Sequence, residues 1–589
     1  MEMEIQKLVN ISINGKPLQV EEETTILKAC RLLNIEIPQL CYTPLHLANR
    51  HNITASCRVC VVEVKNRRNL APSCSTMCTE GMDIYTNTQR VINARRTVVE
   101  LLLSDHPSDC PTCAKNMHCK LQDLSYQMGI REMPYKGEMS EKNEYTSSNF
   151  PIRRNSAKCI LCGNCVMVCD NIQTVNALTT YDRGFITQVG PAFNMALSDT
   201  DCVACGQCVN VCPTGALIQD SDVDKVWKKL GDPTKRVVIQ VAPSVRAALG
   251  EEFGYRIGTA VTGKIPTALR ALGFNGVYDT DFGADLTIVE EATELVQRLQ
   301  KGEKLPMFTS CCPGWITFVE KKFPEFIPNL STCKSPMSMQ GAVIKTFIAK
   351  NLEISPADIV SVAVMPCTAK KDEMNRPQLK EGEYKDVDYV LTTRDLACMI
   401  KEGGLNFDLL ENSRFDNPLG ESTGAADIFG ASGGVMEAAI RCAKFWLEGK
   451  CDDMEFSGLR GIEGIKTQEV EVNGINLRLC VASGLGNARK VLSDIKSGKE
   501  HYDFVEMMAC PGGCINGGGQ PIQSSKMSIN VVKSRAQALY SEDRSKLHRI
   551  SAQNESVNKL YKDYMGELGG HLAHEHLHTT YTDRKHKDF

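Results

Sequence analysis

The sequence has no long uncharged apolar stretch, and it is poor in aromatic residues. Aromatic residues make up 6% of the 589 positions, with three tryptophans. No run of about 18 apolar residues is present to form a membrane span. The opening MEMEIQKLVN lacks the hydrophobic segment of a secretory leader, and no early twin-arginine pair follows it. We therefore expect a cytoplasmic protein without a membrane span.

Neither sign of charge dominates the chain. It carries 67 basic and 71 acidic residues, which leaves a net charge of -4. This balance gives no global reason to expect binding to nucleic acid or to an anionic membrane. The chain is also longer than one hydrophobic core normally supports, so we expect several domains.

Cysteine, by contrast, is abundant, with 27 residues. In a reducing compartment, dense cysteine indicates metal binding rather than disulfides. Three strand-like runs end in cysteine: LPMFTSCCPGW with Cys311 and Cys312, VSVAVMPCTAKK with Cys367, and FVEMMACPGGC with Cys510 and Cys514. Ligands of open α/β sheets gather outside the carboxyl ends of strands, whereas buried structural thiols need no such placement. We predict a metal site at these strand ends.

From about residue 222, apolar strand runs alternate with helical patterns, which indicates a parallel-sheet α/β domain. One segment, ASGLGNARK at 482–490, imitates a dinucleotide-binding fingerprint. Its third position is Arg489, where a third Gly or Ala is needed for close packing of helix on sheet. We interpret the segment as an ordinary turn into a helix and expect no flavin or nicotinamide site in this chain.

An internal repeat precedes that domain. CILCGNCVMVC at 159–169 and CVACGQCVNVCP at 202–213 each contain the spacing C-x2-C-x2-C-x3-C. This is the run of two-cluster ferredoxins, in which the fourth cysteine of each run binds the other cluster. A zinc site would explain the CxxC pairs but not duplicated four-cysteine runs. The spacing predicts one [4Fe-4S] cluster on Cys159, Cys162, Cys165 and Cys212, and a second on Cys202, Cys205, Cys208 and Cys169.

The amino-terminal segment reads as a hairpin followed by a helix. KLVNISING and KPLQVEEE are two strands joined at Asn14-Gly15, a dipeptide suited to a tight hairpin turn. Thr24 or Thr25 can cap the helix TILKACRLLN. Four later cysteines suit a [2Fe-2S] cluster in a β-grasp fold, although their spacing differs from the plant type: Cys41, Cys57, Cys60 and Cys74. Cys30 and Cys78 remain alternatives, because the 15 residues between Cys41 and Cys57 make an unusually long gap.

Between these segments, VINARRTVVELLLSDHPSDCPTCAKNMHC predicts a helix that runs into a ligand-bearing loop. Three cysteines alone cannot fill the four corners of a cubane cluster. A neutral imidazole can take the fourth iron. We therefore expect a [4Fe-4S] site on His106, Cys110, Cys113 and Cys119. His118, beside Cys119, is the competing histidine.

The motifs TSCCPGW, MPCTAKKDE and EMMACPGGCINGGGQP resemble the three signatures of the iron-only ([FeFe]) hydrogenases. The likeness covers the whole chain, since the accessory segments resemble those of long-form hydrogenases and of the large iron-sulfur subunit of respiratory complex I. It implies a multidomain α+β and α/β protein with five parts: a β-grasp [2Fe-2S] domain (1–85), a His/Cys [4Fe-4S] domain (86–145), a two-[4Fe-4S] ferredoxin-like domain (146–221), a two-lobed α/β H-cluster domain (222–525) and a helical, small-subunit-like tail (526–589).

The resemblance also implies the site. Cys312, Cys367, Cys510 and Cys514 match the ligands of the H-cluster, a [4Fe-4S] cube that Cys514 links to a di-iron subsite. In the family, that subsite carries CO, cyanide and azadithiolate, all installed by maturation proteins. Lys370 matches a lysine that hydrogen-bonds one cyanide. The remaining pocket positions are Ala242, Pro243 and Ser244, around the other cyanide and the dithiolate, and the apolar walls Met365, Met508 and Phe429.

Proton delivery is expected to begin at Cys311, which is not needed as a ligand. An ordinary thiol titrates at about 8.5, close enough to neutral for a relay. LTIVEEATELVQRL places Glu291, Glu294 and Arg298 on one helical face. Spacing alone favours a solvated charged face, and we keep that interpretation for Glu290. The resemblance instead assigns Glu291, Glu294, Arg298 and Ser331 to the family's proton pathway.

The expected activity is therefore the reversible conversion of two protons and two electrons to H2. The expected partners are ferredoxin, a flavoprotein NAD(P)H subunit of an electron-bifurcating complex, or both, together with the maturation proteins. A sensory hydrogenase, an electron-transfer subunit and an assembly factor are the alternatives. The His-rich tail HLAHEHLHTTYTDRKHKDF resembles tails of the multi-subunit class, although a disordered or docking tail is equally open. Seven cysteines are interpreted as structural: Cys30, Cys78, Cys333, Cys398, Cys442, Cys451 and Cys480.

Overall fold

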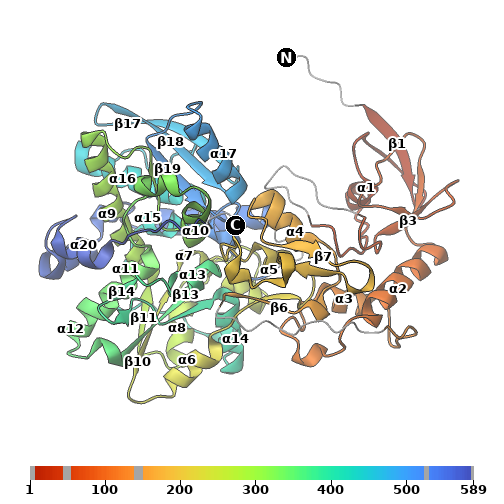
Figure 1. Cartoon of the computed structure of the whole chain (residues 1–589), viewed down its shortest axis with the longest axis horizontal. Coiled ribbons are helices and arrows are strands. Elements are labelled where there is room, and N and C mark those ends of the chain that lie inside the picture. The colour runs from red at the N-terminus through yellow and green to blue at the C-terminus, as the bar shows by residue number, and fades with distance from the viewer. Residues whose placement is uncertain (1–6, 44–54, 138–149, 523–528, 586–589) are drawn as a thin grey trace.

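The computed structural model describes residues 7–43, 55–137, 150–522 and 529–585 (Figure 1). The amino-terminal iron-sulfur segments lie on one side of the molecule, and the large α/β part with the C-terminal helices lies on the other. No helix of the described ranges is long and apolar enough to cross a bilayer.

The amino-terminal segment forms a five-stranded sheet with the order β2-β1-β5-β3-β4. The predicted hairpin is present, with Asn14 and Gly15 both at positive φ. Thr25 is the cap of the first helix, because its side chain accepts the N–H of Lys28. The elements are β1 (Leu8–Ile13), β2 (Lys16–Glu21), α1 (Ile26–Leu32), β3 (Val61–Val64), β4 (Ala71–Pro72) and β5 (Asp83–Tyr85).

The next two segments consist of short helices and loops that carry cysteine. The predicted helix before His106 is α2 (Gln89–Ser104), and α3 (Lys120–Gln127) begins directly after Cys119. The duplicated cysteine runs each enter a short helix, α4 (Asn164–Met167) or α5 (Gln207–Val211). Strands β6 (Ile152–Arg154) and β9 (Leu217–Gln219) close this segment as an antiparallel pair.

The large domain contains two four-stranded sheets. One has the order β11-β10-β13-β16 and is parallel throughout. The other has the order β12-β19-β18-β17, with only β17 antiparallel to its neighbour. The strands are β10 (Arg236–Val241), β11 (Gly276–Asp279), β12 (Met307–Phe308), β13 (Ile359–Met365), β16 (Tyr389–Thr392), β17 (Ile465–Val472), β18 (Ile475–Ser483) and β19 (Phe504–Met508).

Helix α9 (Thr280–Lys301) belongs to the hydrophobic core of this domain. It packs against α11 (Pro336–Val343) and α16 (Gly434–Glu448), and its residues 280–292 are all buried. Other helices of the domain are α6 (Val223–Leu230), α7 (Pro243–Arg246), α8 (Lys264–Ala271), α10 (Pro313–Lys322), α12 (Ala349–Asn351), α13 (Ala369–Glu373), α14 (Thr393–Glu402), α15 (Gly424–Asp427) and α17 (Leu485–Lys496). Segment 482–490 is the turn from β18 into α17, as predicted.

The C-terminal segment packs on the large domain as α18 (Ile529–Ser545), α19 (Glu555–Leu560) and α20 (His571–Leu577). Buried ion pairs attach it: Asp543 bonds Arg441, and Arg535 bonds Glu251. A buried charge is tolerated where it is paired in this way. The described part of the His-rich tail is docked rather than free, since His576 lies 2.7 Å from a carboxylate oxygen of Glu381.

Candidate active site and cluster-binding residues

A cavity of about 80 Å³ lies where the ends of the two sheets meet, and six cysteines line it. Cys367 follows β13 of one sheet, while Cys312 and Cys510 follow β12 and β19 of the other. The predicted convergence at strand ends is present, but between two sheets rather than at the edge of one. The cavity wall is almost entirely apolar. The cavity-lining cysteines are Cys205 from the duplicated runs, and Cys311, Cys312, Cys367, Cys510 and Cys514 from the large domain.

Local sequence explains how these thiols are held. Cys312 is the residue before α10, and Pro313 at the first helical position has its φ preset for a helix. Gly513 has φ 101°, and a Cβ there would lie 2.6 Å from the backbone nitrogen of Ser432. Only glycine fits that close approach. The CPGGC turn can therefore pack tightly beneath the cavity and present Cys514 to it.

All seven predicted pocket residues also line the cavity. They are Ala242, Pro243, Ser244, Met365, Lys370, Phe429 and Met508. The hydroxyl oxygen of Ser244 is buried and has no hydrogen-bond partner among the described residues. An orphaned buried hydroxyl is costly unless a bound group supplies its partner.

The thiols themselves fit a metal cluster. Burial, followed by the neighbouring thiolates, raises the pKa of Cys510 and Cys514 well above the usual range. Packing several thiolates into one dry cavity is unfavourable without a compensating cation, and bound iron supplies that charge. A four-thiol donor set, an apolar wall and an unpaired hydroxyl together suit the H-cluster that the sequence predicts.

Lys370 is buried rather than a surface lysine. Its ammonium lies 2.7 Å from Glu373, donates to Ser335 Oγ at 2.7 Å and reaches the backbone oxygen of Cys311 at 3.2 Å. Burial opposes the charge, but Glu373 offsets that effect, and the net pKa of Lys370 is raised. The site therefore holds a fixed positive charge at the cavity wall.

Sequence reasoning missed Ser335 and Glu373, which position this ammonium. Glu373 was detectable in principle, because it follows Lys370 by three residues in MPCTAKKDE and thus shares its helical face. Ser335 gives no local signal, since it comes from a distant segment.

The predicted proton-pathway residues form a connected group. The Ser331 hydroxyl donates to Glu294 at 3.0 Å and also faces Glu291. Arg298 donates to the other oxygen of Glu294 at 2.6 Å. Burial, and then the proximity of Glu294, raises the pKa of Glu291 to about 8. Glu291 can therefore gain or lose a proton near neutral pH.

Cys311 differs from the expected ordinary thiol. Burial, and then the nearby Glu291, raises its pKa well above the usual range. The thiol is therefore neutral, with its proton in place. This difference arises because the cavity wall excludes water, which sequence spacing does not reveal.

The interpretation of Glu290 as part of a solvated face is wrong. Glu290 is buried, with 1% of its surface exposed. Its carboxylate accepts hydrogen bonds from Tyr561 and from the backbone of Gly569, and His578 lies 3.1 Å away. The C-terminal segment covers this face of α9, and nothing in the local sequence of α9 indicates that cover.

The duplicated cysteine runs are arranged as the crossed pattern predicts. Cys159, Cys162, Cys165 and Cys212 line one small cavity of about 20 Å³. The second group is also close together, since burial and then the nearby Cys205, Cys202, Cys165 and Cys169 raise the pKa of Cys208. Cys165, of the first group, therefore also lies near Cys208. Cys205 additionally lines the catalytic cavity. The second group is therefore adjacent to the predicted H-cluster.

In the amino-terminal domain, Cys41 lies with the other three predicted thiols. The Cys57 N–H donates to Cys41 Sγ at 3.5 Å, and Cys74 lies beside both Cys41 and Cys60. The alternatives Cys30 and Cys78 instead face each other within the hydrophobic core. Most of the long gap between Cys41 and Cys57, at 44–54, falls outside the described residues.

The four predicted ligands around His106 lie within one segment between α2 and α3. Cys110 begins a single helical turn, and Cys119 directly precedes α3. His106 is half-buried, whereas the competing His118 is exposed. The burial pattern favours His106.

Family comparisons cover nearly the whole chain. The model described as "Iron only hydrogenase large subunit, C-terminal domain" matches residues 235–518, and "Iron hydrogenase small subunit" matches 529–584. The accessory segments match a "2Fe-2S iron-sulfur cluster binding domain" (6–89), an "NADH-ubiquinone oxidoreductase-G iron-sulfur binding region" (95–134) and a "4Fe-4S dicluster domain" (158–216).

Full-length relatives agree with these matches. The chain is 48% identical to the NADP-reducing hydrogenase subunit HndD of Solidesulfovibrio fructosivorans, over 98% of this chain and 99% of that protein. It is 41% identical to iron hydrogenase 1 of Clostridium pasteurianum, over 97% and 99% respectively. The solved structure of apo [FeFe]-hydrogenase HydA1 from Chlamydomonas reinhardtii is 40% identical, covers 62% of this chain and 100% of that one, and gives a TM-score of 0.57.

These findings confirm the resemblance drawn from TSCCPGW, MPCTAKKDE and EMMACPGGC, and they confirm a cofactor set of [2Fe-2S], [4Fe-4S] and H-cluster type. They also exclude a pure electron-transfer subunit, because the hydrogenase domain is present in full. The chain belongs to the iron-only ([FeFe]) hydrogenases, which interconvert protons, electrons and H2, and it carries additional iron-sulfur domains.

Proposed function

We propose that this hydrogenase is the hydrogen-handling subunit of a multi-subunit complex that exchanges electrons with NAD(P)H through a flavoprotein partner. The end-to-end match with a relative named as an NADP-reducing hydrogenase subunit carries this proposal. In the segment that imitates a dinucleotide fingerprint, Arg489 donates to Thr174 at 2.7 and 2.9 Å. The proposal places the nucleotide chemistry on a partner.

The proposed cluster ligands follow the four groups of the sequence analysis. Cys41, Cys57, Cys60 and Cys74 would hold the [2Fe-2S] cluster. Three accessory [4Fe-4S] clusters would be held by His106, Cys110, Cys113 and Cys119; by Cys159, Cys162, Cys165 and Cys212; and by Cys169, Cys202, Cys205 and Cys208. The H-cluster would be held by Cys312, Cys367, Cys510 and Cys514. When bound, it supplies the redox chemistry at which H2 is made or split.

The residues of this chain would then bind and orient the H-cluster and supply protons to the reacting group. Lys370 would hydrogen-bond one cyanide, and Ala242, Pro243 and Ser244 would surround the other cyanide and the dithiolate. Met365, Met508 and Phe429 exclude water. Cys311 would exchange its thiol proton with the reacting group and recover it from Glu291.

From Glu291 the proton would continue through Ser331 and Glu294 and leave for solvent beside Arg298, whose guanidinium orients the Glu294 carboxylate. Each of these side chains touches or faces the next, as a relay requires.

Electrons would reach the cavity from the opposite side, through Cys205. Three contacts attach the cluster segment there: Thr368 donates to Ala204 at 2.6 Å, Gln207 donates to Asn516 at 3.0 Å, and Asn210 donates to Gly517 at 3.2 Å. Asn164 also donates to the backbone oxygen of Leu40, beside Cys41, at 3.4 Å. This contact supports a proposed electron route from the amino-terminal domain through the duplicated runs.

The five-part division at residues 85, 145, 221 and 525 belongs to this proposal, as do electron bifurcation, ferredoxin as a further donor, and the cytoplasm as the compartment. Dedicated maturation proteins would install the di-iron subsite, because cysteine thiols can bind iron but cannot make cyanide or CO.

Isolation of the native protein tests the proposal. We expect co-purification with a flavin-containing chain and H2-dependent reduction of NAD(P)+ by the complex but not by this chain alone. Dye-linked turnover of the isolated chain is the control for an intact active site. A monomer that carries no flavin partner and exchanges electrons only with ferredoxin would contradict the proposal.

A further inference from the structure

A second buried polar chain lies beside the proposed proton pathway and involves the C-terminal strap, residues 576–584. The strap crosses the segment that carries Ser331. Cys333 and His578 form an antiparallel bridge, and the Lys334 N–H donates to Leu577 O at 2.8 Å. The Thr579 N–H donates to Thr332 O at 2.7 Å. Backbone contacts therefore fix the strap independently of the His578 side chain.

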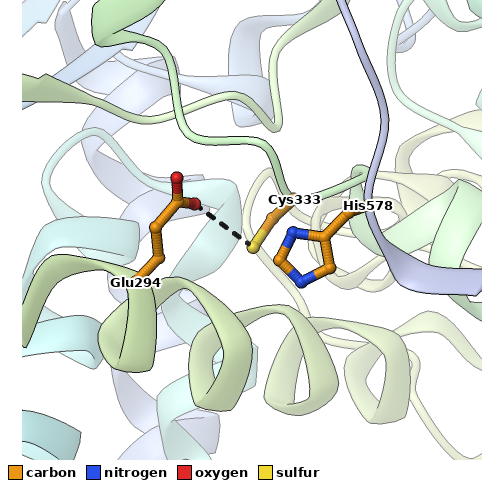
Figure 2. Close-up of side chains that lie close together, drawn as sticks. All are labelled: Glu294, Cys333 and His578. Atoms are coloured by element: carbon orange, nitrogen blue, oxygen red, sulfur yellow. Dashed lines mark hydrogen bonds between the residues drawn. The ribbon is translucent and has the colours of Figure 1, made fainter. Parts of the chain in front are cut away.

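The bridge brings the His578 side chain next to the pathway carboxylate. One ligand atom each from Glu294, Cys333 and His578 lies within 4.8 Å of the other two. Cys333 Sγ lies 3.9 Å from Glu294 Oε2. Figure 2 shows the thiol between the carboxylate and the imidazole. A proton on Glu294 therefore needs one bridging group, the Cys333 thiol or a water, to reach His578.

The partners of His578 permit both protonation states. Nε2 lies 3.1 Å from Glu290, and this carboxylate keeps a proton on that nitrogen. Nδ1 lies 2.7 Å from the Thr332 hydroxyl. A hydroxyl donates to a neutral ring and accepts from a protonated one, so either state is satisfied without rearrangement.

A path from His578 to solvent is also present. The ring of His574 lies 4.1 Å from that of His578, centroid to centroid, and His574 is exposed. Arg298, which bonds Glu294, lies on a different side of the carboxylate. The titratable and charged groups around His578 are Glu290 and Glu294 from α9, Cys333 from the crossed segment, His574 from α20 and Tyr561 behind Glu290.

We propose that His578 is a second outlet of the proton pathway, parallel to Arg298 and branching at Glu294. This inference rests on the proposed role of Glu294. In H2 oxidation, the O–H bond of protonated Glu294 breaks and its proton passes through the bridging group to the Thr332 hydroxyl, which in turn gives its own proton to Nδ1 of His578. The imidazolium then releases its proton to water beside His574. In H2 production the same steps run inward, and no electron moves along this branch.

Paired variants test the branch. His578→Gln keeps an amide that can bond Glu290 but cannot carry a proton, and Arg298→Gln impairs the other outlet. Because the outlets are parallel, each single change should lower dye-linked H2 turnover by about twofold, while the double variant should lose about 20-fold or more. His571→Gln, an exposed position on α20, is the matched control. Rates are normalised to mature centres by the CO and cyanide infrared bands.

The results of these measurements distinguish a second proton outlet from a purely structural role of His578. Loss in the double variant equal to the product of the single losses would overturn the second outlet. Full turnover in Glu294→Gln would instead overturn the pathway itself, since both branches begin there. If His578→Gln assembles poorly, His578→Ala is measured with added imidazole. Recovery of turnover, together with recovery of the wild-type pH profile, supports proton transfer, whereas no recovery means that His578 only positions the strap.

Discussion

The two sides of the catalytic cavity are built from different chemistry. Towards Cys205, the structure offers sulfur, apolar side chains and neutral amides such as Gln207. Towards Cys311, it offers a row of carboxylates, hydroxyls and a guanidinium that ends at Arg298. Electrons pass between clusters without a protein donor group, while protons need titratable atoms in near contact. In the proposed assignment, the cavity receives electrons and protons by two routes that share no side chain.

The proposed electron and proton routes come closest at Cys311 and Cys312, which are adjacent in the sequence. Substitutions at these two residues should therefore have the largest effects. Cys312→Ala should remove a cube ligand, and we expect the loss of the H-cluster and of all turnover. Cys311→Ala should keep the full iron content but lower H2 turnover by about 10²-fold or more, because the nearest exchangeable proton is missing. Iron analysis and infrared spectra measure the first effect, and H2 production measures the second. An intact H-cluster in Cys312→Ala would mean that the two roles are exchanged.

The next prediction concerns the pH dependence of stability, and it tests the side of the cavity that is proposed to carry protons. Glu291 has a pKa raised to about 8, so its carboxyl holds a proton below that pH and loses it above. A raised acid pKa means that the folded protein binds this proton more tightly than the unfolded chain does. Stability is therefore lost as pH rises from about 4.5 towards 8.

Glu291→Gln should abolish turnover at every pH, and it should also unfold at a higher temperature than the wild type above pH 8 but not below pH 5. Calorimetry of the mature protein across pH measures the second effect. Glu469→Gln, an exposed position on β17, is the control. Identical pH dependence in wild type and Glu291→Gln would contradict a raised pKa.

How far the sequence predicts this site depends on whether a residue's partners are local. Spacing alone predicted the crossed groups around Cys165 and Cys208, because a short repeat leaves the chain few ways to fold. The convergence of Cys367 with Cys510 was predictable from strand ends. Glu290 was misjudged because its burial depends on residues about 270 positions later. The raised pKa of the Cys311 thiol was missed for the same physical reason, since desolvation is a property of the packed cavity and not of any motif.

A smaller effect on activity is expected from a change at the ion pair between Lys370 and Glu373. Glu373→Gln should leave the cube in place but weaken retention of the di-iron subsite, because the ammonium loses its carboxylate partner at 2.7 Å. We expect about a tenfold lower activity at equal cube content, because a buried charge-assisted contact is lost. Infrared band intensity per iron measures subsite retention. Glu383→Gln, an exposed position nearby in sequence, is the control. Unchanged intensity in Glu373→Gln would show that Ser335 and the backbone oxygen of Cys311 position Lys370 without Glu373.

The smallest effect on dye-linked turnover is expected farthest from the cavity. Replacing Cys57 and Cys60 by Ser should abolish the [2Fe-2S] signal, since both thiols lie in the group around Cys41. Exchange with the protein partner should slow, while a small dye that donates at other clusters should still support turnover. Cys30→Ala, a thiol of the hydrophobic core, should keep the signal and both activities. Equal loss of dye-linked and partner-linked turnover in the Cys57/Cys60 variant, with the other clusters intact, would mean that the amino-terminal domain shapes the catalytic cavity itself. The separation of the electron and proton sides would then not extend beyond the cavity.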